Sequence, residues 1–155
     1  METHFRQSPR LKAFDYAGAH AYSLTFVTRQ RAPLFRNPNA VRLAEDALLS
    51  STAKHHFSLV AYCFMPDHVH ALVIGGDDSR LADFVRLFKQ LAGYHVKQLL
   101  GAPLWQVSYY DHVVRTEEDL SALTDYVLDN PVRAGLVSDR ADYPYSGPRL
   151  LVDAH

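Results

Sequence analysis

The chain has 155 residues, a formal net charge of −1 and 48% hydrophobic residues, the composition of an ordinary soluble globular protein with one core. No apolar run approaches the ~20 residues of a membrane helix, and the polar, basic N-terminus does not resemble a secretory signal. Cys63 is the only cysteine, which excludes an intramolecular disulfide and is typical of a reducing compartment, so we expect a cytoplasmic protein.

Charge is distributed unevenly along the chain. Residues 1–36 hold six Lys and Arg against two Asp and Glu, and residues 80–100 hold four against one, whereas residues 115–129 hold one against five. Two basic segments of this kind indicate surfaces that could follow a phosphate backbone. A solvated helix face and a solvated terminal segment explain the same pattern.

Hydrophobic periodicity predicts alternating strands and helices along most of the chain. The expected strands are 21–28, 57–65, 68–74 and 105–114, and the expected helices are 39–54, 80–100 and 117–129. Asn39, Ser79 and Thr116 are the expected N-caps of these helices. Pro131 is expected to end the last helix, because proline disfavours helical geometry at the residue before it.

The order of these elements is a split β-α-β arrangement that resembles the ferredoxin-like fold. We therefore expect a single α+β domain at 21–147, with a four-stranded and mainly antiparallel sheet, helices on one face and a separate C-terminal helix. Residues 1–20 are expected to form a flexible basic arm, and residues 148–155 a C-terminal tail.

The most informative motif is a pair of histidines, His68 and His70, at the start of the strand 68–74. Alternate side chains of a strand point to the same face, so both imidazoles share a face, with their backbones about 6.5–7 Å apart. Two imidazoles in this arrangement can converge on one divalent metal. The same pair could also face solvent without a ligand.

The residue types leave the identity of a metal open. Structural zinc sites usually use four dedicated ligands including thiolates, and Cys63 is the only thiol. Two histidines with an oxygen ligand would leave positions for water and phosphate, which is typical of Mg²⁺ or Mn²⁺ phosphoryl-transfer sites.

On the last helix, Tyr126 and Asn130 stand four residues apart, so we expect both on one face at the edge of its buried stripe.

Several motifs, taken together, resemble one family. They are YCFMPDHVH at 62–70, LWQ at 104–106, YYDH at 109–112 and DYVLDNPVRAGLV at 125–137. The combination is similar to the REP-associated tyrosine transposases, within the single-tyrosine HUH (insertion-sequence-200-like) transposase superfamily. The resemblance covers nearly the whole chain, whereas the His-x-His element alone would not be specific.

The resemblance implies metal-dependent cleavage and rejoining of single-stranded, hairpin-containing DNA. His68 and His70 would bind Mg²⁺ or Mn²⁺, with Asn130 in the place of the third ligand, where better-known insertion-sequence relatives use glutamine. Tyr126 would be the nucleophile, leaving a 5′-phosphotyrosine on the enzyme and a free 3′-hydroxyl on the DNA. His112 is a candidate to help the tyrosine ionise, although a structural role explains this residue as well.

Members of this family recognise short palindromic hairpins, so the expected partner is single-stranded or hairpin DNA, without a membrane. Candidate phosphate contacts are Arg6, Arg10, Lys12, Arg80, Arg86, Lys89, Lys97 and Arg133. Trp105, Tyr109 and Tyr110 are candidates to stack on unpaired bases, and each could instead have an ordinary core or surface role. Both a monomer and a homodimer are compatible with the sequence.

Two other functions stay open at the level of sequence. The protein could be a non-catalytic DNA-binding regulator of palindromic repeats that kept the fold and lost the chemistry. It could also be a metal-dependent nuclease in which water, rather than tyrosine, attacks the phosphate. The intact His68, His70 and Tyr126 favour an enzyme over the regulator.

Overall fold

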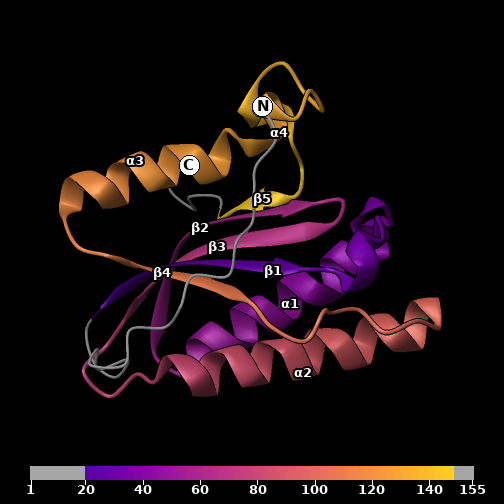
Figure 1. The fold of residues 1–155 in the computed structure, drawn as a ribbon, viewed down its shortest axis with the longest axis horizontal. Coiled ribbons are helices and arrows are strands. Elements are labelled where there is room, and N and C mark those ends of the chain that lie inside the picture. Colours follow the sequence, from indigo (N-terminus) through magenta and orange to yellow (C-terminus); the bar gives the residue numbers. More distant parts are fainter. Residues whose placement is uncertain (1–19, 149–155) are drawn as a thin grey trace, which may run out of the picture.

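The computed structural model describes residues 20–148 as an α+β domain (Figure 1). Its elements in chain order are β1 (Ala21–Val27), α1 (Pro38–Lys54), β2 (Phe57–Met65), β3 (His68–Gly75), α2 (Leu81–Leu100), β4 (Tyr110–Val114), α3 (Glu117–Leu128), α4 (Asn130–Arg133) and β5 (Ser146–Gly147). Short 3₁₀ turns lie at Arg29–Arg31, Leu34–Arg36 and Arg140–Asp142. None of the helices between residues 20 and 148 has the length and apolar character needed to cross a bilayer.

The strands form one antiparallel sheet in the order β4-β1-β3-β2-β5. The first four strands have the order expected of a split β-α-β arrangement, which confirms the predicted fold class. The sheet has five strands rather than four, because the short strand β5 pairs with Tyr62 and Cys63 at the free edge of β2. β3 is therefore the central strand, with hydrogen-bonded neighbours on both sides.

Two layers of helix cover the sheet (Figure 1). The helices α1 and α2 pack on one face, where apolar residues such as Phe84 and Phe88 bury against Val69 and Val73 of β3. The helix α3 lies over the other face and packs against β2 and β3. Alternation along β3 directs His68 and His70 to this second face, the face on which α3 lies.

Two of the predicted helix caps differ in the structure. The N-cap of α1 is Asn37, whose side-chain oxygen accepts a hydrogen bond from the backbone N–H of Asn39 at 2.9 Å. The N-cap position of α2 is Arg80, which makes no capping hydrogen bond. The Oγ of Ser79 instead accepts the N–H of Gly76 at 2.7 Å, so it stabilises the preceding loop.

The last predicted helix is divided into two elements. Thr116 caps α3 as expected, since its hydroxyl accepts the N–H of Asp119 at 3.1 Å. The helix ends at Leu128, and a separate turn, α4, contains Asn130 and Pro131. The expectation that Tyr126 and Asn130 share one continuous helix was therefore wrong.

The fourth predicted strand is shorter than 105–114. Only Tyr110–Val114 pairs with β1, whereas Trp105 forms a single bridge with Thr28. The Trp105 ring packs on Phe26 and Phe88, with ring centroids 5.9 and 5.5 Å apart respectively. Trp105 thus belongs to the core, which argues against its proposed role in stacking on bases.

Candidate active site

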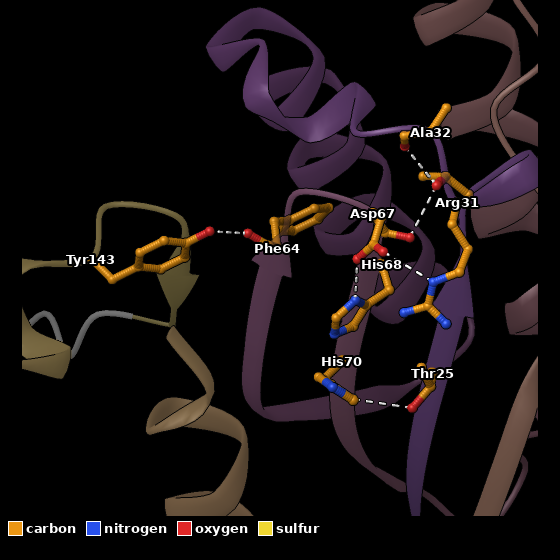
Figure 2. Close-up of polar contacts among 9 residues, drawn as sticks. Thr25, Arg31, Ala32, Phe64, Asp67, His68, His70 and Tyr143 are labelled. Atoms are coloured by element: carbon orange, nitrogen blue, oxygen red, sulfur yellow. Dashed lines mark hydrogen bonds and ion pairs between the residues drawn. The ribbon is translucent and has the colours of Figure 1, made fainter. Parts of the chain in front are cut away.

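The site is centred on the histidine pair of β3. His68 and His70 are 7% and 4% exposed, and their ring centroids lie 4.7 Å apart at an interplanar angle of 82°. The predicted common face is therefore confirmed, but it is buried in the domain rather than turned to solvent. Figure 2 shows both rings on the same side of the sheet, next to Asp67 and Thr25.

A hydrogen bond fixes one nitrogen of each ring. The Nδ1 of His68 lies 2.7 Å from Oδ1 of Asp67, and the Nδ1 of His70 lies 3.0 Å from Oγ1 of Thr25 (Figure 2). Such bonds set the tautomer and orientation of a ligating histidine, so Nε2 is the nitrogen that each ring would present to a metal. The sequence analysis did not identify Thr25, which becomes the neighbour of His70 only through the β1–β3 register.

Burial and the neighbouring charged groups shift the pKa values of Asp67 and His70. The hydrogen bond from His68 lowers the pKa of Asp67 to about 2, with a further contribution from Arg31, so this carboxylate is ionised at neutral pH. Burial, with smaller contributions from His68 and Arg133, holds the pKa of His70 well below its ordinary value. A neutral imidazole keeps the lone pair that a metal requires.

Asn130 is the first residue of α4, which packs against β2, the strand next to β3. It is 4% exposed, and its side-chain Nδ2 is buried without a hydrogen-bond partner among the described residues. A buried amide without a partner is costly in a folded protein and indicates an unfilled interaction. An acceptor such as a phosphate oxygen would satisfy Nδ2, whereas the amide oxygen of the same side chain is the atom that could bind a metal.

The described residues contain no group of three or more His, Cys, Asp or Glu arranged to hold a metal ion. Any metal would consequently rest on the two histidines and a ligand of another type. Two imidazole nitrogens with one amide oxygen suit a divalent cation that keeps open positions. Asn130 is the candidate for that third ligand, because it is buried and its amide oxygen is of the type that such an ion accepts, so the residue types present fit the implied ion.

Tyr126 lies beside the histidine pair in the same chain. Its ring centroid is 6.2 Å from that of His70, and the residue is 37% exposed. The guanidinium carbon of Arg133 lies 3.8 Å from the centroid of the Tyr126 ring, and one of its N–H groups donates to the Tyr126 carbonyl oxygen at 2.7 Å. Arg133 therefore fixes both the ring and the backbone of Tyr126.

Of the other predicted basic residues, those that the structure describes are separate from this site. Arg6, Arg10 and Lys12 lie outside the described residues. The helix α2 packs on the opposite face of the sheet. Its N-cap residue is Arg80, and it contains Arg86, Lys89 and Lys97. Lys89 donates hydrogen bonds to the carbonyl oxygens of Gln106 and Val107, at 3.0 and 3.1 Å.

The remaining predicted helper and base-stacking residues lie on and before β4. His112 pairs with Ser23 of β1 and is exposed, on a strand at the edge of the sheet. Tyr109 stacks on Phe26, with ring centroids 5.6 Å apart, so it contributes to the core. Tyr110 begins β4 and is partly buried. These positions give no geometric support for a role of His112 in ionising the tyrosine.

Comparison with known families identifies the class of protein that this fold and site define. Residues 17–130 match the family model described as "Transposase IS200 like". Because the match covers most of the chain, this protein belongs to the IS200-like transposase family.

Individual relatives narrow the similarity to the REP-associated tyrosine transposases, as the motifs predicted. The Escherichia coli K12 REP-associated tyrosine transposase is 26% identical over 107 residues, covering 68% of this chain and 62% of that protein. A Haemophilus influenzae protein assigned provisionally to the same group is 28% identical over 146 residues. The match covers 86% of this chain and 81% of that protein. A REP-associated tyrosine transposase solved with a REP hairpin superposes with a TM-score of 0.72, at 21% identity, over 94% of this chain and 82% of that chain.

Proposed function

We propose that this protein cleaves and rejoins single-stranded, hairpin-containing DNA through a covalent 5′-phosphotyrosine at Tyr126, with Mg²⁺ or Mn²⁺ as the cofactor. One observation carries the proposal: the Tyr126 ring stands 6.2 Å from that of His70 in the same chain, beside a pair of oriented imidazoles. Membership of a transposase family supports strand cleavage and transfer as the class of reaction.

His68, His70 and Asn130 are the residues that would hold the ion. When bound, a divalent cation polarises the scissile phosphate and stabilises the charge that develops on its oxygens. The ionised Asp67 accepts a hydrogen bond from Nδ1 of His68 and so fixes the tautomer and orientation of that ring, and the Thr25 hydroxyl fixes the orientation of His70 through its Nδ1.

The Tyr126 oxygen attacks phosphorus in line, forming one P–O bond as the bond to the 3′-oxygen breaks. The phenolic proton leaves to solvent or a base, and the departing 3′-oxygen takes up a proton to become a hydroxyl. Because phosphotyrosine is still a phosphodiester, a 3′-hydroxyl can reverse the step and join a new end. Because Tyr126 is 37% exposed, a DNA strand can approach it from solvent.

The DNA partner is proposed from the solved relative and from charge. That relative was solved with a REP hairpin, and this chain has the same fold over nearly its whole length. The predicted contacts on α2 would then bind parts of the hairpin away from the scissile phosphate, because α2 lies on the opposite face of the sheet.

The test uses a labelled hairpin oligonucleotide with single-stranded flanks, Mn²⁺ and the whole chain. We expect a covalent DNA adduct that survives a denaturing gel and that does not form when a chelator is present from the start. Tyr126→Phe should form no adduct, because its ring lacks the attacking oxygen. The matched control is Tyr94→Phe, a tyrosine that is 60% exposed on α2 and that should leave the adduct unchanged.

The outcomes separate the alternative functions. Cleavage by Tyr126→Phe, with free 5′-phosphate ends and no adduct, would mean that water attacks and that the protein is a nuclease. Hairpin binding without cleavage in either metal would indicate a regulator that has lost the chemistry.

A further inference from the structure

A cavity of about 390 Å³ opens directly beside His68. Three segments meet to form it: the two 3₁₀ turns after β1, the turn between β2 and β3, and the segment after α4. Its volume lies within the roughly 300–1,000 Å³ range of small-molecule sites. The reaction described above uses His68 and Asp67 but assigns no role to the other residues of this cavity.

The walls of the cavity combine apolar and cationic groups. Met65, Pro66 and Leu136 line it with apolar surface, and the guanidinium groups of Arg31 and Arg36 are exposed at its edge. Its lining includes a single carboxylate, that of Asp67, which is already bonded to His68 and Arg31. The lining is therefore net positive and favours an anion that also carries an apolar or flat group.

The backbone holds Arg31 in place at an energetic cost. Gln30 and Arg31 have φ angles of 56° and 54°, in the left-handed region that non-glycine residues rarely adopt. This conformation is unfavourable for a residue with a side chain. It accompanies a 3.1 Å hydrogen bond from Nε of Arg31 to Oδ2 of Asp67, the carboxylate that orients His68 (Figure 2).

Arg36 is the other cation of the cavity. It ends the short turn Leu34–Arg36 and is exposed, and its side chain makes no hydrogen bond or ion pair with the residues that the structure describes. A guanidinium presents donors in a planar fork that matches a phosphate. Arg36 is therefore placed to bind a phosphate at the rim while a base occupies the apolar wall.

We infer that this cavity binds one nucleotide of the DNA strand, adjacent to the scissile phosphate. The base lies against Met65, Pro66 and Leu136, and the phosphate contacts Arg36. The position next to the scissile phosphate rests on the proposed function, because His68 lines both the cavity and the candidate metal site. The binding itself depends only on the cavity.

The test is a titration of the whole chain, without metal, with each of the four deoxynucleoside 5′-monophosphates. Binding is monitored through the changes in the backbone amide chemical shifts measured by NMR. We expect shifts at residues 31–36, 65–68 and 134–136. Arg36→Gln should weaken binding by about tenfold, the loss expected for one charge-assisted hydrogen bond. Arg42→Gln, an exposed arginine of α1 outside the cavity lining, is the matched control and should bind as the wild type does.

A second variant, Ala134→Trp, should fill the cavity and abolish the shifts while the rest of the spectrum stays folded. Shifts elsewhere, no shifts at millimolar nucleotide, or equal affinity in Arg36→Gln would overturn the inference. Inorganic phosphate that binds as tightly as the nucleotides would also overturn it, because the base would then contribute nothing. If no covalent adduct forms but these shifts appear, the proposed reaction fails while the nucleotide site stands.

Discussion

At the scale of single residues, the site combines rigid imidazoles with a tyrosine held by an arginine. Asp67 and Thr25 fix the histidines, and Arg133 fixes Tyr126 through its ring and its carbonyl oxygen. The sequence analysis proposed Arg133 as a phosphate contact. Its contacts in the structure favour a positioning role, because the same side chain holds two parts of the nucleophile.

This role makes a prediction for Arg133→Ala. Loss of the cation–π contact and one hydrogen bond should slow adduct formation by about tenfold or more, at saturating DNA. The dissociation constant for the hairpin should change little, and Arg133→Lys should restore part of the rate. Arg115→Ala, an exposed arginine just before α3, is the control. A weakened hairpin affinity with an unchanged rate would instead support a phosphate contact.

At the scale of elements, the two sides of the sheet differ in how deeply their helices are buried. The helix α2 buries six residues: Leu81, Phe84, Val85, Phe88, Ala92 and Val96. Val127 is the single buried residue of α3 in the described structure. The helix that carries the tyrosine is therefore held less strongly than the helices of the opposite face.

Two truncations should show this difference. Phe88→Ala should lower the free energy of unfolding by about 3–5 kcal/mol, because it opens a cavity in the main core. Val127→Ala removes two methyl groups and should cost about 1–2 kcal/mol, yet it should slow adduct formation because α3 packs less firmly. Urea denaturation and the adduct assay measure the two effects. A loss of stability in Val127→Ala as large as that in Phe88→Ala would contradict the difference.

At the scale of the whole molecule, the described residues place Tyr126 and the histidines of one chain together. A site completed within one chain predicts a result for mixed variants. An equimolar mixture of His68→Ala and Tyr126→Phe should form no more adduct than either variant alone. The control is a mixture of wild type with Tyr126→Phe, which should keep the activity of its wild-type fraction. Recovery of adduct in the mixed variants would mean that two chains share a site.

The sequence was sufficient for those parts of the fold that depend on local pattern. The alternation around His68 predicted the common face, and the sequence order of the elements predicted the fold class. Asn37 could also have been recognised as the cap of α1, because Pro38 is typical of the first helical position. The assignment to Asn39 missed this signal.

Other features depend on contacts between distant residues. Thr25 bonds His70 only because of the β1–β3 register, and Trp105 is partly buried because Phe26 and Phe88 meet it from other elements. The break between α3 and α4 was not predicted, because the last helix was expected to run unbroken until it ended just before Pro131. In the structure that proline lies inside a new turn. No local pattern contains these arrangements.

The central position of β3 has a consequence for the timescales of the site. Amides of a strand with neighbours on both sides exchange with solvent only when the whole domain opens, whereas amides of a lightly buried helix exchange through local opening. The histidines of β3 and the tyrosine of α3 thus belong to regions of different opening free energy. Hydrogen exchange should find β3 among the slowest segments and α3 among the faster ones. The proposed nucleophile, Tyr126, would then be able to move away with its DNA strand while the histidines stay in place.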